Sequence, residues 1–250
     1  MNQLPSHTTE EIASRWRDAV SRTVGASRAV SILYSGGLDS SLVAVSAREF
    51  AKVELVTVGV QGSRDLVAAE EGARLLAMEW ASRTIERMDV ERVFASDGNL
   101  FAGTRLASRA VLVGLALALE ATHHSNVLCG QGADELFLGY AHFEGLSPAD
   151  VFRRREEDLD RLLSTDWPLS ISLGKRRNKI LGSPFLDSDF LTFGRALSID
   201  RLRAGRGRKP LLREVALALG VPEELANRPK RAFQYGSGLE RLVRARSRSG

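Results

Sequence analysis

A glycine- and serine-rich turn at residues 35–41 (SGGLDSS) combines residue types that bind phosphate groups. Glycines let the backbone approach a ligand closely, and the N–H groups at a helix start attract anions. Asp39 would repel phosphate unless a divalent cation lay between them, so the turn also implies Mg²⁺. The phosphate-binding candidates in this turn are Ser35, Gly36, Gly37, Asp39, Ser40 and Ser41.

A second turn with acidic residues lies in the segment 127–140 (VLCGQGADELFLGY). Gly130 and Gly132 follow a short apolar run, and Asp134 follows them at the expected start of a helix. Carboxylates at a helix start also suit the helix dipole without any ligand. The functional interpretation places Asp134 opposite Asp39, so that both would hold one Mg²⁺. Neither turn has the Walker pattern, and Glu135 stands where a dinucleotide-binding motif needs its third glycine.

The elements that must position these turns alternate along the first part of the chain. Apolar runs predict strands at 29–34, 53–60, 79–86 and 127–128. Helical patterns predict helices at 8–21, 38–50, 65–78 (capped by Asp65) and 103–121. This alternation predicts an α/β fold, a Rossmann-like parallel sheet with helices on both faces.

After Tyr140 the strand signals stop, and a mainly helical part is expected. Helix starts and periodic segments occur at 147–150, 187–197, 209–219 and 222–227. We therefore divide the chain into an N-terminal helix (1–28), an α/β core (29–145) and a helical, basic part (146–250). The arginine-rich tail 241–250 is expected to fray.

Charge is distributed unevenly between these parts. Residues 1–150 have a net charge of −6, whereas residues 151–250 have a net charge of +10. A basic half fits a polyanionic ligand such as a nucleotide, pyrophosphate or RNA. An arginine-rich composition with solvated helix faces explains the same numbers without any ligand.

Composition excludes several classes of protein. The single cysteine, Cys129, rules out a disulfide framework and a multi-cysteine zinc site. The longest uncharged apolar run, 110–119, is too short to span a bilayer, and the first residues do not resemble a secretion signal. A cytoplasmic protein with no membrane partner is the expectation, whereas the oligomeric state cannot be predicted.

The turn SGGLDSS resembles the pyrophosphate-loop signature of the ATP pyrophosphatase family. Members of that family cleave ATP between the α and β phosphates, adenylate a substrate and let a nucleophile displace AMP. The resemblance implies ATP and Mg²⁺ as ligands, with Asp39 and Asp134 as the metal-binding residues.

The segment CGQGADELFLGY is similar to the asparagine synthetase motif SGEGSDELFGGY. Weaker matches follow in the family's order at 56–66, 183–187 (SPFLD), 209–213 (KPLLR, interpreted as a helix-packing element) and 228–238 (RPKRAFQYGSG). The resemblance implies an adenine contact at Leu33 and Val58, and a catalytic lysine at Lys230. The remaining nucleotide-binding residues that it implies are Gly130, Gly236, Ser237 and Gly238.

Two departures from the asparagine synthetase pattern affect the expected chemistry. Gln131 stands where the family motif has a glutamate associated with the adenylate and incoming ammonia. It can orient an intermediate but cannot accept a proton. Asn2 follows Met1 where full-length asparagine synthetases have the cysteine of a glutaminase domain. Free ammonia, ammonia from a separate glutaminase subunit or another nucleophile is therefore expected.

The leading hypothesis is an ATP-dependent amide-forming ligase that converts a carboxylate, aspartate in the first instance, with ammonia. One alternative is an adenylating RNA-modification enzyme, motivated by the basic second part but opposed by the lack of an RNA-binding motif. The other is a non-catalytic ATP-binding subunit or regulator, in which Gln131 marks lost chemistry.

Overall fold

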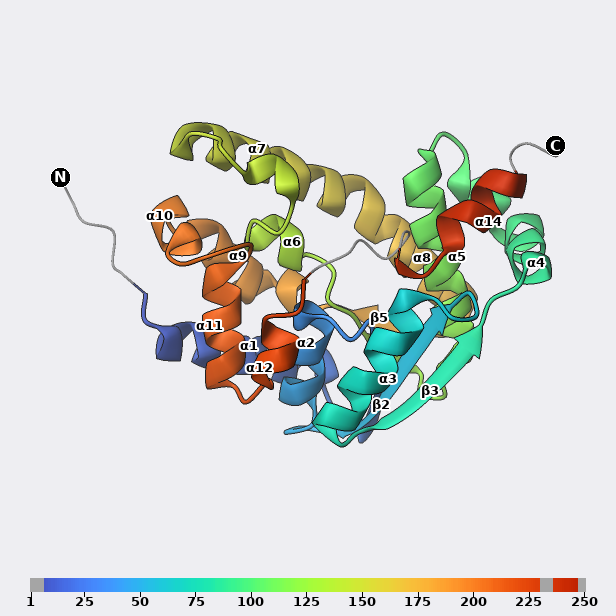
Figure 1. Cartoon of the computed structure of the whole chain (residues 1–250), viewed down its shortest axis with the longest axis horizontal. Helices are drawn as coiled ribbons and strands as arrows, with labels where there is room; N and C mark the ends of the chain where they lie inside the picture. The colour runs from blue at the N-terminus through green and yellow to red at the C-terminus, as the bar shows by residue number, and fades with distance from the viewer. Residues whose placement is uncertain (1–6, 230–235, 247–250) are drawn as a thin grey trace.

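The computed structural model describes residues 7–229 and 236–246. Its centre is a five-stranded, fully parallel sheet with the strand order β3-β2-β1-β4-β5 (Figure 1). The strands are β1 (Ala29–Leu33), β2 (Lys52–Gly59), β3 (Glu79–Thr84), β4 (Asn126–Leu128) and β5 (Ile180–Gly182). The predicted α/β fold with a parallel sheet is confirmed.

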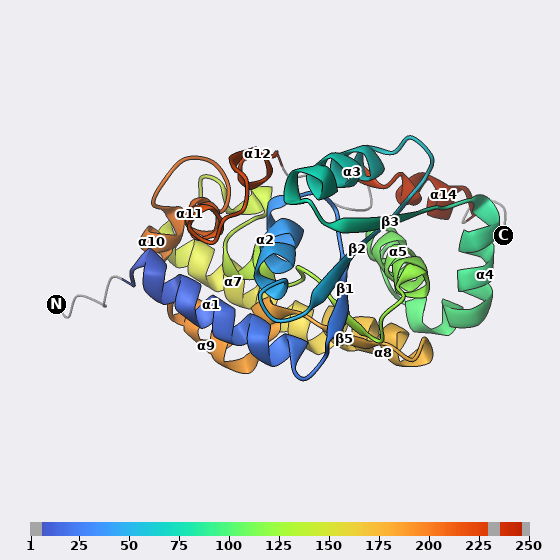
Figure 2. The ribbon, with the colours of Figure 1, turned by 90° about the horizontal axis from the view of Figure 1, so that it is seen from below.

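Helices cover both faces of this sheet (Figure 2). One hydrophobic cluster joins the sheet to α1 (Thr9–Val24), α2 (Leu38–Ala47) and α3 (Arg64–Leu76). The cluster on the other face contains residues of α4 (Arg87–Asp97), α5 (Leu106–Ala121), α8 (Trp167–Arg176) and α14 (Leu239–Arg246). Successive strand residues point to opposite faces, so Ile32 and Leu55 join the first cluster and Val58 the second.

The remaining helices pack mainly beside α1 and α2, at the end of the molecule nearer the N-terminus (Figure 1). They are α6 (Ala133–Leu136), α7 (Pro148–Arg161), α9 (Ser188–Ala196), α10 (Ile199–Arg203), α11 (Pro210–Ala218) and α12 (Glu223–Ala226). A π-helical turn (Leu162–Asp166) connects α7 to α8. Short 3₁₀ helices are Gly98–Phe101, Ala141–Phe143 and Pro184–Leu186.

Three predictions about elements are wrong. Strands do not stop after Tyr140, because β5 pairs with β4; three residues are too few to show an alternating pattern. Asp65 does not cap α3, since Ser63 occupies the N-cap position and Asp65 lies in the first turn. The tail is helical through Arg246, because buried Leu239 and Val243 anchor α14. The predicted boundaries at 28/29 and 145/146 stay predictions.

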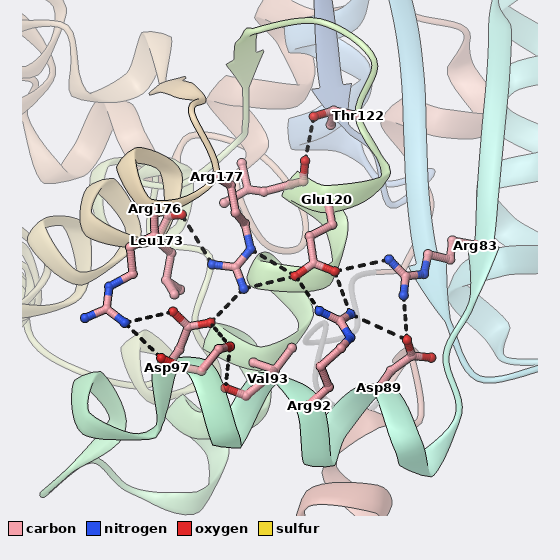
Figure 3. Close-up of polar contacts among 12 residues, drawn as sticks. Arg83, Asp89, Arg92, Val93, Asp97, Glu120, Thr122, Leu173, Arg176 and Arg177 are labelled. Atoms are coloured by element: carbon pink, nitrogen blue, oxygen red, sulfur yellow. Dashed lines mark hydrogen bonds and ion pairs between the residues drawn. The ribbon is translucent and has the colours of Figure 1, made fainter.

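An ion-pair network joins α4, α5 and α8 beside β3 (Figure 3). Glu120 on α5 accepts hydrogen bonds from Arg83, Arg92 and Arg177. Asp97, which is almost completely buried at the end of α4, accepts from Arg177 at 2.7 Å and Arg176 at 3.1 Å. Burial would raise the pKa of Asp97, but the hydrogen bonds from Arg177 and neighbouring groups lower it below its usual range. These charges hold the helices of the second face together.

No helix in the described part of the chain combines the length and apolarity that a membrane crossing requires.

Candidate active site

The sheet topology brings the two predicted turns together. β1 has β2 on one side and β4 on the other, so the order of connections reverses between β1 and β4. In open parallel sheets, ligands bind at such a switch point, outside the carboxyl ends of the strands. Residues 35–41, hereafter the phosphate loop, leave β1 at this edge, and residues 129–134 leave β4 at the same edge. The topology therefore explains why residues about 95 positions apart lie side by side.

The phosphate loop is shaped by its glycines. Gly36 has a φ of +70°, and a Cβ atom there would lie 2.3 Å from the carbonyl oxygen of Ala68 on α3. Gly37 is the N-cap residue of α2 and has no side chain to cap the helix. The first N–H groups of α2 therefore face outward beside Asp39, an arrangement that attracts anions.

The serines of the loop divide into two groups. Ser35 lines a pocket, and its backbone N–H donates to the Oγ of Ser40 at 3.2 Å. Ser40 also donates to the Gly37 carbonyl at 3.3 Å, so its hydroxyl stabilises the turn. Ser41 is completely buried and lies 3.2 Å from the hydroxyl of Tyr34. Of the three predicted serines, only Ser35 lines the pocket.

One ammonium group joins the two predicted metal-binding residues, Asp39 and Asp134, hereafter the carboxylate pair. The Nζ of Lys209 lies 2.7 Å from both carboxylate oxygens of Asp39 and 2.8 Å from Oδ1 of Asp134. The Lys209 side chain is only 3% exposed, so the two carboxylates, rather than water, compensate its positive charge. Both acids thus converge on the Lys209 ammonium group, while their predicted role as metal ligands stays a prediction.

The carboxylate pair fits Mg²⁺, because this ion is commonly bound by one or two carboxylates together with substrate phosphates. Among residues 7–229 and 236–246, no group of three or more His, Cys, Asp or Glu side chains could hold a metal ion. An ion at the carboxylate pair would therefore need water or phosphate oxygens to complete its coordination.

A pocket of about 310 Å³ opens beside the carboxylate pair. Its wall combines the phosphate loop with basic residues from the helical part of the chain. The lining residues are Ser35, Gly37, Leu38, Asp39, Arg64, Asp65, Ala68, Gly139, Arg208, Lys209, Arg213, Arg228 and Pro229. A pocket with this charge suits a polyphosphate chain.

Arg228 ties the loop to the neighbouring helix. Its guanidinium donates to the carbonyl oxygens of Gly36 at 2.9 Å and Ala68 at 2.6 Å, and to Glu71 at 2.7 Å. Arg213 donates to the Arg208 carbonyl at 2.9 Å. The segments KPLLR and RPK contain Lys209 and these arginines, but the sequence pattern alone does not indicate that their side chains reach the phosphate loop.

Gln131 lies at the turn after β4, and its surroundings are hydroxyl groups. Ser183 donates to its backbone carbonyl at 2.6 Å, and the Oγ of buried Ser170 is 3.4 Å from its side-chain oxygen. Gly130 packs on the first turn of α2, since a Cβ there would approach that of Asp39 at 3.0 Å. Gln131 thus lies in the same turn after β4 that leads to Asp134, but its role in the reaction stays a prediction.

The predicted adenine end lies at the neighbouring strand. Leu33 and Val58 belong to one hydrophobic cluster on the second face of the sheet. The backbone N–H of Val60 donates to the Ser237 carbonyl at 2.9 Å, and a Cβ on Gly236 would clash with Asp65. Gly238 has a φ of +77° and lies against Val60. These predicted residues are therefore gathered around the end of β2, whereas Lys230 lies outside the described residues.

Burial changes the pKa of two groups near the site. Burial raises the pKa of Glu135, whose carboxylate accepts a 2.6 Å hydrogen bond from Tyr140. Burial also raises the pKa of the Cys129 thiol to about 11. Cys129 is therefore protonated near neutral pH, as expected for a buried thiol directly after strand β4.

The fold and the site together define an α/β protein in which the phosphate loop, the carboxylate pair and a basic pocket meet at one edge of the sheet. The chain belongs to the asparagine synthase family, whose sequence model matches residues 11–179 and 181–248. That family comprises ATP-dependent amide-forming ligases.

Among curated relatives, a putative glutamine-hydrolysing asparagine synthetase of Methanocaldococcus jannaschii is 29% identical. The match covers 86% of this chain and 47% of that protein. The mouse glutamine-hydrolysing asparagine synthetase is 28% identical over 88% of this chain and 42% of its own length. The chain thus spans about half the length of these relatives.

The solved structure of NMN synthetase from Francisella tularensis has a similar fold. The TM-score is 0.52 with 14% identity, covering 97% of this chain and 87% of that one. At this identity the likeness supports the α/β architecture alone.

Proposed function

We propose that this chain is the ATP-using part of an amide-forming ligase of the asparagine synthetase type. A carboxylate oxygen of the substrate attacks the α-phosphorus of ATP, the bond to the bridging oxygen breaks, and pyrophosphate leaves. Ammonia then attacks the acyl carbon, AMP departs, and one proton is released. Aspartate is the proposed carboxylate, because the relatives are named asparagine synthetases.

The carboxylate pair beside the phosphate loop is the observation that supports this proposal. Asp39 and Asp134 would hold Mg²⁺, which supplies positive charge against the leaving pyrophosphate. The N–H groups at the start of α2 and the arginines of the pocket would bind the phosphate chain. Lys230 is proposed to contact the α-phosphate and the oxyanion, as the resemblance implies.

The nitrogen source is part of the proposal. The curated relatives are named as glutamine-hydrolysing enzymes, and this chain matches less than half of each. We propose that the described part uses ammonia, either free or delivered by a glutaminase that is not part of the matched region. Gln131 would orient the intermediate by hydrogen bonds, while water or phosphate takes the proton.

One assay tests these points together. AMP release from ATP is measured against a panel of carboxylates, with ammonium, glutamine or neither. We expect AMP and asparagine with aspartate plus ammonium, and no asparagine with aspartate plus glutamine alone. ATP binding without AMP release for every carboxylate and RNA tested would instead support a non-catalytic regulator.

An adenylating RNA-modification enzyme is the second candidate, favoured by the four arginines that line the pocket. If RNA is the substrate, AMP release should depend on added tRNA. Binding of that tRNA should weaken steeply with salt, because phosphate contacts release counterions. AMP release with amino acids in RNA-free protein would exclude this candidate.

A further inference from the structure

Lys209 places its ammonium group where a metal ion would contact the carboxylate pair. Its Nζ lies 2.7–2.8 Å from oxygens of both acids, and the side chain is 3% exposed. A Mg²⁺ ion bound by the same two acids would need an oxygen of each at about 2.1 Å. The ammonium and the ion would therefore compete for the same oxygens and repel each other.

The backbone conformation at Lys209 helps to fix the position of its side chain. Lys209 is the N-cap residue of α11 with a φ of +53°, a left-handed conformation that is unfavourable for a lysine. Pro210 follows at the first position of the helix, and the N–H of Arg213 donates to the Lys209 carbonyl at 3.0 Å. The start of α11 thereby fixes the direction in which the side chain leaves the backbone.

Gly139 provides the space that this arrangement needs. A Cβ atom on Gly139 would lie 2.2 Å from the Cε of Lys209 and 1.9 Å from Oδ1 of Asp134. Any larger residue would therefore separate the lysine from the carboxylate. The contact between Lys209 and Asp134 thus depends on two distant positions of the chain. These are Lys209 at the start of α11 and Gly139 after α6.

The pocket offers Lys209 an alternative partner. Lys209 and Asp39 both line it, beside Arg208, Arg213 and Arg228. A polyphosphate bound there would bring phosphate oxygens next to the ammonium group. Lys209 could then exchange a carboxylate for a phosphate without becoming a buried unpaired charge, which would be costly.

We propose that Lys209 is a positioning residue that couples metal binding to polyphosphate binding. When no polyphosphate is bound, its ammonium group contacts the oxygens of Asp39 and Asp134 and prevents a divalent cation from binding to them. A bound polyphosphate attracts the ammonium group, and the carboxylate oxygens then become accessible to the cation. This inference rests on the proposed use of the carboxylate pair as the magnesium site.

Titration with MnCl₂ alone, followed by electron paramagnetic resonance, tests the proposal on the full chain. Lys209→Met keeps the length of the side chain and removes the charge. We expect it to bind Mn²⁺ at least roughly tenfold more tightly than the natural protein. Adding Asp134→Asn to Lys209→Met should abolish the gain, which would locate the ion at the carboxylate pair. Lys179→Met is the control, because Lys179 donates to the carbonyls of Thr122 and His124 and to no carboxylate among the described residues.

Equal Mn²⁺ affinity of Lys209→Met and the natural protein would overturn the proposal, as would a gain that survives Asp134→Asn. If Lys209→Met fails to fold, Lys209→Gln is titrated in its place under the same criteria. The readout needs neither ATP nor an acceptor carboxylate. Failure to release AMP therefore bears on the proposed function, whereas an unchanged Mn²⁺ affinity bears on the role of Lys209 at the carboxylate pair.

Discussion

Replacing Gly36 by alanine tests how closely the phosphate loop approaches α3. Gly36 and Gly62 have the same φ of +70°, but their surroundings differ completely. A Cβ on Gly36 would meet backbone atoms of Ala68 and Ala69 at 2.3–2.8 Å, whereas a Cβ on Gly62 would have nothing within 4 Å. Gly62→Ala is therefore a matched control for the cost of the left-handed conformation.

Two free-energy costs, the left-handed conformation and the backbone overlap, apply to Gly36→Ala, whereas only the first applies to Gly62→Ala. The left-handed conformation costs an alanine about 1–2 kcal/mol, and the smaller entropy of the unfolded chain returns about 0.4–1 kcal/mol. Gly62→Ala should therefore lower the free energy of unfolding by about 0–1.6 kcal/mol. Backbone overlap at Gly36 adds roughly 1–3 kcal/mol, because helix α3 must shift.

Urea unfolding at 25 °C measures the difference. With a slope of about 3 kcal/mol/M, an additional 2 kcal/mol would lower the midpoint of Gly36→Ala by roughly 0.7 M relative to Gly62→Ala. Gly36→Ala should also weaken ATP binding, since the loop and its N–H groups move with the backbone. Identical midpoints for the two variants would refute the close approach of the loop to α3.

The remaining predictions concern the ion-pair network, the buried thiol and the two residues proposed to act in catalysis. Glu120→Gln should lower the free energy of unfolding by about 1.5–3 kcal/mol in urea titrations, because three arginines lose a charged acceptor. The pKa of Asp97 is lowered in the fold, so its stabilisation is present above the unfolded pKa of about 3.9 and is lost as pH falls through the lower folded value. Urea midpoints below about pH 4 should therefore fall less steeply in Asp97→Asn. Cys129→Ala should leave AMP release unchanged, and iodoacetamide should label the folded natural protein slowly at pH 8, because the thiol pKa is about 11. In assays of AMP and amide formed, Gln131→Glu should raise the amide-to-AMP ratio, whereas Lys230→Ala should cut ATP–pyrophosphate exchange at least roughly tenfold without changing the circular dichroism spectrum.

The α/β core could be predicted from the sequence because its signals are local. Strand β1 is an apolar run interrupted by Ser31, and Gly36 and Gly37 mark the turn that follows it. Ser147 and Pro148 likewise mark the start of α7. The topology rule for parallel sheets then suffices to place Asp134 near Asp39, since both follow strands that end at one edge.

Lys209 could not be assigned from the sequence, because its contacts are long-range. Its partner Asp39 lies 170 positions away, and the segment KPLLR has the apolar spacing of an ordinary packing helix. Strand β5 was missed for a similar reason: its hydrogen bonds come entirely from pairing with β4. Both features depend on the assembled tertiary structure.

Strand β5 also determines when the sheet can be completed during synthesis. About 50 residues separate it from β4, so a ribosome adding about 5–20 residues per second needs roughly 3–10 s to supply it. Throughout that interval the outer edge of β4 has no neighbouring strand, and an unpaired edge can recruit other chains. The nascent chain therefore passes through a vulnerable period that ends only when β5 has been made, after α7 and α8.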